Sequence, residues 1–366
     1  MKLVICMIKY IIRRLVQSIP IFFGITLLSY FLLWLAPGDP IIRLYFAPNI
    51  KAERRAELRA QLGVDDPFHI QYLRWLIGDD WLRWDSDGDG IADQAFELFT
   101  QLDTNGDGKP EPPGSNYGIL RGDFGNSFVR KKPVMEIIAS AIPATLELSI
   151  AALLFAMVVG IPVGVISATK KGSIFDNVSR VLAVLLNAIP DFWLGLILLL
   201  VIAVLLGLVP LGGRCGLTLT GECPPFLQRL QYLILPAFVL SGSNMASFSR
   251  YLRTSTLEVL SQDYIRTAKA KGLSQRQIDF RHALRNALIP FATLLGPIMT
   301  NLWAGATVIE TVFAWPGLGR VFFNGAIQQD YPVVMGIVII SAIATILGFL
   351  LSDILYVLID PRIRLS

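Results

Sequence analysis

Carboxylates at the spacing of a calcium loop are the residues of this sequence best suited to coordination chemistry. Between about residues 78 and 118 the composition shifts to Asp, Gly and Asn. Calcium loops supply oxygen ligands at positions 1, 3, 5, 7 and 9, and a glycine at position 6 makes the turn. Gly90 takes that sixth position here. The predicted ligands of this first copy are Asp85, Asp87, Asp89, the carbonyl of Ile91, and Asp93.

A second, weaker copy of the pattern follows, with Asp103, Asn105 and Asp107 as its predicted ligands. Position 12, where an EF-hand places a bidentate Glu, is Phe96 in the first copy and Gly114 in the second. We therefore expect a modest calcium affinity, in the roughly 0.1 to 1 mM range of extracellular modules. The alternative is a solvated acidic linker that binds no metal.

Four other carboxylates lie in or beside apolar segments, where an unpaired carboxylate costs about 2.5 to 3.5 kcal/mol on insertion scales. They are Glu147, Asp191, Glu310 and Asp353. Each is expected to face the interior of a helix bundle or an interface. Such carboxylates either line the path of a transported molecule or accept hydrogen bonds near helix ends. The packing role is favoured for Glu147 and Asp353, and both roles stay open for the other two.

Cysteine and histidine are scarce, with three and two copies in the chain. Cys215 and Cys223 share one short polar segment, and an oxidising compartment would allow a disulfide between them, whereas Cys6 lies near the N-terminus. The alternative is two unrelated surface thiols. His69 and His282 do not stand in an H-E-x-x-H context, which disfavours a zinc enzyme.

The elements that must position these residues are membrane-spanning helices. The 366 residues are 54% hydrophobic and 16% charged, with a mean hydropathy of +0.57, whereas soluble domains are about a quarter charged. Apolar runs of about 20 residues match a hydrocarbon layer about 30 Å thick, and lipid cannot pair an open strand edge. The sequence therefore predicts an all-α integral membrane protein with six spans, at 15–36, 144–166, 181–208, 232–249, 287–313 and 333–359.

The distribution of Lys and Arg predicts the orientation of these spans. Basic residues cluster before the first span, after the second, between the fourth and fifth, and in the tail. The opposite short loops hold only Arg214, Arg229 and Arg320. By the positive-inside rule both termini face the cytoplasm, which an even number of spans requires. The first apolar run is too long for a signal peptide and is expected to be retained.

The predicted spans divide the chain into three parts. Residues 1–36 form the cytoplasmic N-terminus and the first span, and residues 37–142 form a large external loop with the acidic insert at about 78–118. Residues 143–366 form a five-helix core. A basic cytoplasmic loop at about 254–286 interrupts that core between the fourth and fifth spans.

That cytoplasmic loop predicts two short helices joined by a glycine turn. Residues 255–271 favour a helix, Gly272 can supply its left-handed cap, and Ser274 suits the N-cap of the second helix. A basic elbow of this kind can also be a topology determinant that lies on anionic lipid.

The sequence of this loop resembles the coupling loop of permeases in binding-protein-dependent ABC importers, in the dipeptide and oligopeptide branch. The matching segments are YIRTAKAKGLS at 264–274 and RHALRN at 281–286. In that family the loop inserts a short helix into a cleft on the ATPase subunit. Arg266-Thr267-Ala268 replaces the usual Glu-Ala-Ala and Arg285 replaces the usual proline, departures that suit the first of two paired permeases. The resemblance implies ATPase coupling by Tyr264, Arg266, Thr267, Ala268, Lys271, Gly272, Leu273 and Ser274.

Further segments similar to the same branch extend along most of the chain. None falls within the acidic insert at about 78–118. They lie at 10–15, 35–40, 122–127, 143–148, 310–319 and 360–362.

The resemblance implies a multi-pass permease of the cell membrane that forms half of a translocation path, with dipeptides or oligopeptides as cargo. Its implied partners are a homologous second permease, two ATPase subunits or domains, and an extracytoplasmic substrate-binding protein, with no role for nucleic acid. The sequence holds no G-x-x-x-x-G-K-[ST] phosphate loop, so the chain is not expected to be an enzyme, and ATP would be bound by the partners. Transport should need no cofactor on this chain.

The alternative function is a secondary transporter or channel subunit that is not driven by ATP. Such transporters are typically built from two inverted halves with paired broken helices. We find no internal repeat of this kind in the sequence, which favours the ATP-driven importer.

Overall fold

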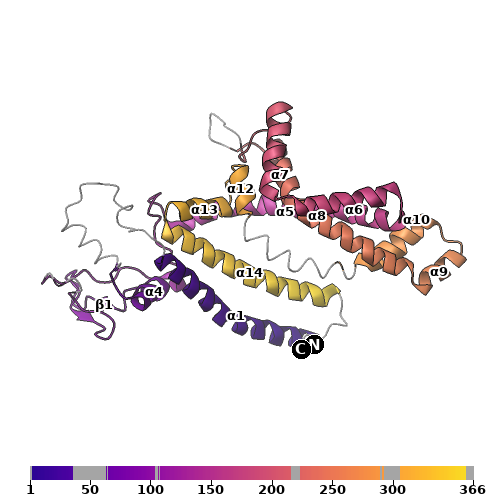
Figure 1. Ribbon diagram of the computed structural model, residues 1–366. Coiled ribbons are helices and arrows are strands. Elements are labelled where there is room, and N and C mark those ends of the chain that lie inside the picture. The colour runs from indigo at the N-terminus through magenta and orange to yellow at the C-terminus, as the bar shows by residue number, and fades with distance from the viewer. Residues whose placement is uncertain are drawn as a thin grey trace. The chain divides into compact units, whose positions relative to one another are not determined.

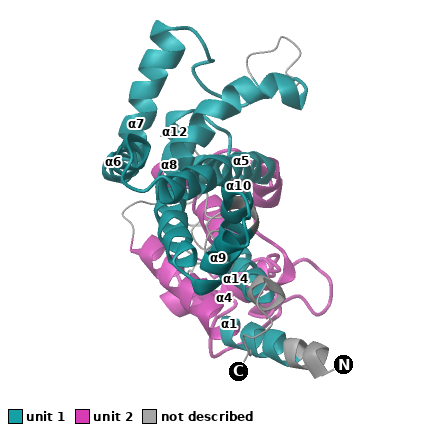
Figure 2. Ribbon diagram, turned by 90° about the vertical axis from the view of Figure 1, so that its right-hand side faces the viewer, with its two compact units in different colours: residues 1–18, 141–321, 341–366 teal, residues 19–140, 322–340 magenta. Residues whose placement is uncertain are grey.

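The computed structural model is mostly helical (Figure 1). It describes residues 2–35, 63, 65–103, 106, 108–215, 223–288, 291 and 306–359. The chain divides into two compact units (Figure 2). Unit 1 comprises residues 1–18, 141–321 and 341–366, and unit 2 comprises residues 19–140 and 322–340.

Three helices in the described part of the chain are long and apolar enough to cross a membrane. They are Lys9–Trp34 within α1 (Lys2–Trp34), α5 (Val134–Thr169), and Tyr331–Ile354 within α14 (Tyr331–Ile359). These helices contain the second and sixth predicted spans and all but the last two residues of the first, which confirms the helical membrane class. The count of six spans stays a prediction.

The third predicted span is a broken helix. It consists of α6 (Ile174–Ala188) and α7 (Asp191–Leu198), and a π-helix at Leu199–Leu205 continues α7. The two arms meet at an angle of 104°. Ile189 adopts extended backbone angles before Pro190 because the proline ring disfavours a helical residue in front of it. The break therefore lies where the sequence places Pro190 and Asp191.

The fourth predicted span lies within α8 (Phe226–Leu260), which is not among the apolar candidates. Its small and polar residues have a packing role, since α5 and α8 approach closely. A Cβ added at Gly164 would lie 2.6 Å from the Ser249 carbonyl oxygen, and one added at Gly160 would lie 3.0 Å from the Met245 carbonyl oxygen. Ser241 and Ser249 are buried. Small residues permit such close helix contacts in membranes. Most of the fifth predicted span falls outside the described residues.

Unit 1 has a core built on α5 and α8. Buried side chains of these helices pack with α12 (Thr307–Val312) and with the turn that follows it. Phe248 of α8 contacts the ring of Phe291 edge-on, with centroids 4.9 Å apart. The buried cluster that joins α5, α8, α12 and the following turn consists of Ala144, Leu148, Leu233, Leu235, Ala237, Val239, Ile309, Phe313 and Trp315.

Unit 2 contains an aromatic cluster that packs α4 (Phe68–Ile77) against the end of α1. Tyr30 of α1 contacts the rings of Tyr72 and Trp75, with centroids 5.7 and 5.3 Å apart. The Thr26 hydroxyl lies 2.9 Å from the Tyr72 hydroxyl. These contacts hold α4 against α1. Helix α4 is the first helix of the described part of residues 37–142.

The acidic insert closes on itself at its two ends, both within unit 2. The Asp79 N–H donates to the Asn116 carbonyl at 2.9 Å, and the Asn116 N–H donates to Asp79 Oδ1 at 2.8 Å. Gly78 and Gly118 touch through their backbones, because a Cβ on Gly118 would lie 2.2 Å from the Gly78 nitrogen. Inside the insert, β1 (Arg83–Trp84) and β2 (Gln94–Ala95) form an antiparallel pair. The boundaries predicted from composition, 78 and 118, are therefore a structural neck.

Candidate functional site

The predicted coupling loop forms three short helical pieces beside the end of α8 (Figure 1). They are α9 (Asp263–Ala270), α10 (Gln275–Gln277) and a π-helix at Ile278–Leu284. The single helix predicted over 255–271 is wrong, since α8 ends at Leu260 and a separate helix begins at Asp263. Gln262 adopts extended backbone angles there. Asp263 then favours a new helix start, because an acidic side chain in the first turn suits the helix dipole.

Helix α9 is amphipathic and sits on a small apolar seat. Ile265 is completely buried and Ala268 is buried beside it, and both pack against Ile278. Val259 and Leu260 complete the seat. All the other predicted coupling residues are exposed, namely Tyr264, Arg266, Thr267, Lys271, Gly272, Leu273 and Ser274. The loop thus exposes a polar, basic face, while Ala268 packs with Ile265 and Ile278 on the buried face of α9.

The turn after α9 has the geometry predicted from Gly272 and Ser274. Gly272 has a φ of 77°, the left-handed conformation that glycine adopts without a Cβ clash. The Leu273 N–H donates to the Ala268 carbonyl at 3.3 Å and caps the helix. Ser274 and Gln277 form a capping box, in which the Gln277 N–H donates to Ser274 Oγ at 3.4 Å. Both ends of the turn are therefore fixed by hydrogen bonds.

Two further bonds join the loop region to the helix that leads into the fifth predicted span. The Asn286 amide donates to the Tyr264 hydroxyl at 3.1 Å. The Ser255 hydroxyl donates to the Ala287 carbonyl at 3.3 Å. A displacement of α9 would consequently be felt by α8 and by residues 278–288.

Sequence reasoning missed a buried ion pair between α6 and α8. The Asp176 side chain is 1% exposed and pairs with Arg253 at 2.7 Å. Asp176 also accepts the Gly172 N–H at 2.9 Å, and its own N–H donates to the Ser173 hydroxyl. The signal that could have found Asp176 is the S-x-x-D capping pattern at 173–176, which marks a helix start. Its partner, Arg253, was recognised only as one of many basic residues.

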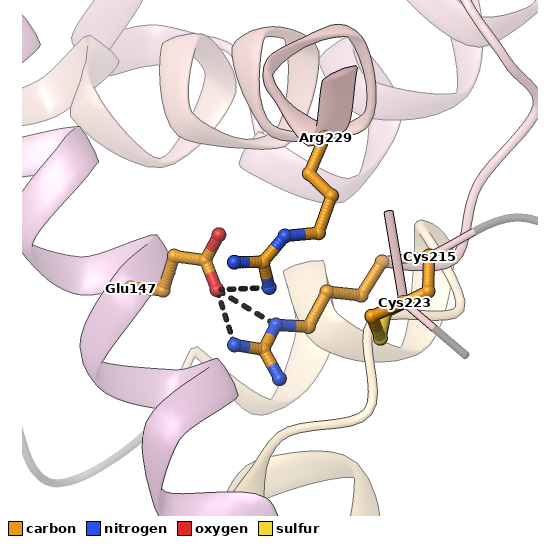
Figure 3. Close-up of a disulfide and its surroundings, with 5 residues drawn as sticks. Glu147, Cys215, Cys223 and Arg229 are labelled. Atoms are coloured by element: carbon orange, nitrogen blue, oxygen red, sulfur yellow. Dashed lines mark hydrogen bonds and ion pairs between the residues drawn. A yellow bond between two sulfur atoms is a disulfide. The ribbon is translucent and has the colours of Figure 1, made fainter. Parts of the chain in front are cut away.

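Glu147, a predicted path residue, lies between two arginines near a disulfide (Figure 3). Arg214 places Nε at 2.7 Å and Nη2 at 2.5 Å from Glu147 Oε2, and Arg229 places Nη1 at 3.5 Å from the same oxygen. Cys215 and Cys223 are joined, with their Cα atoms 4.7 Å apart. Arg214 directly precedes Cys215, so the disulfide anchors the chain next to this arginine.

Glu310, a second predicted path residue, is completely buried. Its carboxylate accepts a hydrogen bond from the Thr145 hydroxyl at 2.8 Å and one from the Arg320 N–H at 2.9 Å. Arg320 lies in the first turn of α13 (Leu318–Ile327), so Glu310 caps that helix. A Cβ on Gly317 would lie 2.3 Å from Glu310 Oε1, which explains the glycine at this close approach.

The remaining two predicted path residues differ in their surroundings. Asp353 of α14 accepts a hydrogen bond from the Tyr10 hydroxyl at 2.7 Å and pairs with Arg14 at 3.1 Å. Asp191 begins α7 directly after the break and is half-buried. Within the described part of the chain, Asp191 has no hydrogen-bond or ion-pair partner for its carboxylate. No Lys, Arg or His occurs in the sequence of residues 289–305.

The first predicted calcium loop brings three of its ligands together. Carboxylate oxygens of Asp85, Asp87 and Asp89 lie within 4.8 Å of one another. The N–H groups of Gly90 and Gly88 donate to Asp85 at 2.7 and 2.6 Å and hold the pKa of its carboxyl below the usual range. Three convergent carboxylates are a donor set that suits Ca²⁺.

The other predicted calcium ligands are placed differently. Asp93 turns toward Ser86 and accepts its N–H at 2.8 Å. Ile91 donates its N–H to Asp89 at 2.8 Å. In the second copy, Asp103 accepts the N–H groups of Gly106 and Gly108, the same arrangement as in the first loop. Asn105 and Asp107 lie outside the described residues.

Comparisons with known proteins cover nearly the whole chain. Residues 160–365 match the family of binding-protein-dependent transport system inner membrane components, and residues 7–81 match the N-terminal region of such components. The oligopeptide transport system permease protein AppB of Bacillus subtilis is 40% identical, over 98% of this chain and 100% of that protein. The dipeptide transport system permease protein DppB of Escherichia coli is 37% identical, over 98% and 99%.

A solved structure of the MetNI methionine ABC transporter, in an inward-facing conformation, covers 61% of this chain and 97% of its own. It is 19% identical with a TM-score of 0.45. The matched family region begins within α5 and includes the predicted coupling loop and the broken third predicted span. The chain therefore belongs to the family of inner-membrane permease components of binding-protein-dependent transport systems.

Proposed function

We propose that this chain is the permease of an ATP-driven importer of dipeptides or oligopeptides. The observation that carries the proposal is the α9 helix, which keeps an apolar face on its own seat and leaves a basic face free for an ATPase. The names of the Bacillus and Escherichia relatives support peptides as the substrate class. The assembled importer would contain a homologous second permease, two ATPase subunits or domains, and an extracytoplasmic binding protein.

The proposed topology has six spans in the cell membrane and both termini in the cytoplasm. The three long apolar helices and the bent pair of α6 and α7 in the described residues support it, together with the charge bias of the loops. In this arrangement the 37–142 segment is external. The Cys215–Cys223 disulfide is then on the oxidising side, where such bonds persist.

In the proposed mechanism, closure of the ATPases moves α9 as a rigid piece. The buried contacts of Ile265 and Ala268 pass that movement to the π-helix at Ile278–Leu284, and the continuous α8 passes it to Arg253. The paired Asp176 then carries it into α6 and toward the break before α7. ATP binding and hydrolysis occur on the partner chains, because this sequence lacks a phosphate loop.

The four membrane carboxylates divide between the path and the scaffold in this proposal. Asp191 is the best candidate to face the path, since it lies at the break of a span without a partner among the described residues. Glu310 and Asp353 are held by Thr145 and Tyr10 and are assigned to packing. Glu147 pairs with Arg214 and Arg229.

The test of this function is transport by the reconstituted complex. The chain should copurify with a second permease and two ATPases, and proteoliposomes should take up a labelled dipeptide only when ATP and the binding protein are present. Uptake that continues without ATP would favour the alternative, a secondary transporter or channel. A complex that hydrolyses ATP but takes up no peptide would contradict the substrate class.

We also propose that the acidic insert binds Ca²⁺ and that the ion folds the loop rather than signals. The three convergent carboxylates of Asp85, Asp87 and Asp89 support this, together with the spacing of the motif. Titration of the complex with Ca²⁺ should protect the insert from proteolysis, and Asp85→Asn with Asp89→Asn should abolish the protection. Asp80→Asn is a matched control, because Asp80 pairs with Arg121 outside the loop.

The insert is further proposed to help dock the binding protein. Removal of residues 80–116 joins two positions that are already adjacent, so the rest of unit 2 should fold. A slower uptake at low binding-protein concentration is expected. Unchanged uptake would remove the docking role.

A further inference from the structure

The Glu147 cluster contains more positive charge than its single carboxylate can neutralise (Figure 3). Arg214 and Arg229 both approach Glu147, at 2.5 and 3.5 Å, which leaves a net charge of about +1 on three side chains. Their side chains are 19%, 17% and 12% exposed for Arg214, Arg229 and Glu147. A surplus cation in such a partly desolvated place favours an incoming anion.

The hydrogen bonds of this cluster are distributed unevenly. An arginine and a carboxylate normally form a fork with two parallel bonds to two oxygens. Here both nitrogens of Arg214 converge on Glu147 Oε2. Glu147 Oε1 and Arg229 Nε are buried and have no hydrogen-bond partner among the described residues. Within the described part of the chain, one unpaired acceptor and one unpaired donor therefore lie in the same cluster, and buried polar atoms of this kind are rare in folded proteins.

The scaffold holds these groups in place from several directions. Glu147 lies on α5 between the buried residues Ala144 and Leu148. Arg229 lies at the end of the first turn of α8, with its guanidinium 5.9 Å from the centre of the Phe226 ring. The disulfide fixes the neighbour of Arg214. Because Arg214 already satisfies Oε2, the weaker contact at 3.5 Å leaves Arg229 available for another ligand.

We propose that this cluster is a binding site for the C-terminal residue of a peptide substrate. The free carboxylate of the peptide binds the Arg229 guanidinium, and the backbone N–H of the same residue donates to Glu147 Oε1. One amino-acid residue carries both groups next to each other, which matches the free donor and the free acceptor. This assignment rests on the proposed function, and in the proposed topology the site lies in the outer half of α5, near the outer end of the second predicted span.

The test compares a peptide with its C-terminal amide in the complete reconstituted importer. The probes are the dipeptide Ala-Phe and Ala-Phe-NH₂, each supplied at concentrations that saturate the binding protein, as measured on that protein alone. Arg229→Gln should lower the uptake rate of the free acid about ten- to a hundredfold, the range expected for one charged hydrogen bond, and leave the uptake rate of the amide unchanged. Arg229→Lys keeps the charge and should restore part of the loss.

Arg130→Gln is the matched control, since Arg130 is an exposed arginine of the predicted external loop. The importer with this substitution should transport both probes like the wild type. An equal loss of both probes in Arg229→Gln would overturn the proposal and leave Arg229 a packing role. An unchanged acid-to-amide ratio with weaker capture of the binding protein would overturn it in favour of protein docking. A wild-type importer that takes up neither probe would instead refute the peptide function itself, and the site assignment with it.

Discussion

The Arg253 guanidinium of α8 donates two hydrogen bonds to the Asp176 carboxylate of α6, from Nε at 2.7 Å and from Nη2 at 2.8 Å. This fork is the strong, geometrically specific form of an arginine–carboxylate contact. Asp176 lies in the first turn of α6, and Arg253 lies two turns before α8 ends at the predicted coupling loop. The pair thus joins the arm that leads to the broken span with the helix that leads to α9.

Asp176→Asn should destabilise the permease and weaken coupling. The Arg253 side chain is only 18% exposed, and the substitution removes the carboxylate that neutralises its charge. Loss of one partner of a buried ion pair lowers the free energy of unfolding by about 3 kcal/mol. Thermal unfolding of the purified complex and uptake per ATP hydrolysed would measure the two effects. Arg253→Lys should lie between mutant and wild type, because lysine keeps the charge but loses the fork. The exposed Arg250→Gln serves as control, and an unchanged Asp176→Asn would contradict the assigned role.

Gly272→Pro should uncouple ATP hydrolysis from uptake while membrane insertion stays intact. Proline fixes φ near −65°, whereas Gly272 has a φ of 77°, so the turn between α9 and α10 cannot form. Gly272→Ala should have a milder effect, since a left-handed non-glycine residue costs about 1 kcal/mol. Gly213→Ala places the same strain at a φ of 84° in another loop and should leave the coupling ratio unchanged. Normal peptide uptake by Gly272→Pro would refute the coupling assignment.

Gly317→Ala should destabilise the turn that Glu310 organises. The new methyl group would lie 2.3 Å from Glu310 Oε1 and displace the carboxylate from the start of α13. Overpacking of this kind costs about 1 to 3 kcal/mol, measurable as a lower midpoint of unfolding for the complex. Gly24→Ala makes the same change where no atom lies within 4 Å and should be neutral. Equal stability of both variants would show that the turn adapts.

Calcium protection of the insert should weaken as the pH falls, because Ca²⁺ binds only ionised carboxylates. The hydrogen bond from the Asp89 N–H lowers the pKa of Asp87. The side-chain hydrogen bond between Asp87 and Asp85 and the negative charge of Asp89 together raise the pKa of Asp87 by more, so the net shift is upward. Asp87 therefore takes up its proton at a higher pH than an ordinary Asp, and Asp85 at a lower one. Proteolysis at a series of pH values with Ca²⁺ would measure this. Protection that persists until all carboxylates protonate would contradict a role for Asp87.

Local signals in the sequence predicted the coupling turn well. Gly272 and Ser274 each specify one backbone conformation, and both adopt it. The break between α8 and α9 was not predicted, because residues 255–271 all tolerate a helix and only the extended Gln262 interrupts it. Pro190 likewise marked the position of the broken span, but not its angle of 104°.

Contacts between distant residues could not be predicted from the sequence. Asp176 and Arg253 are separated by 77 positions, and Glu147 and Arg214 by 67. Patterns within a helix do not reveal which basic residue a carboxylate meets. The small and polar residues of α8 lower its hydropathy, and α8 is therefore not among the helices apolar enough to be span candidates. Small residues are needed in α8 because this helix approaches Gly160 and Gly164 of α5 closely. That contact depends on both helices and cannot be read from the sequence of either one.

The neck at Gly78 and Gly118 makes the acidic insert a modular addition, because the chain enters and leaves the insert at adjacent positions. Gly114 also donates its N–H to the Arg83 carbonyl, so the base is bonded within the insert itself. A segment whose entry and exit coincide can be gained, lost or exchanged during evolution without rethreading the helices around it. The same property makes this position a natural place to install an affinity tag or a fluorophore for following the importer in living cells.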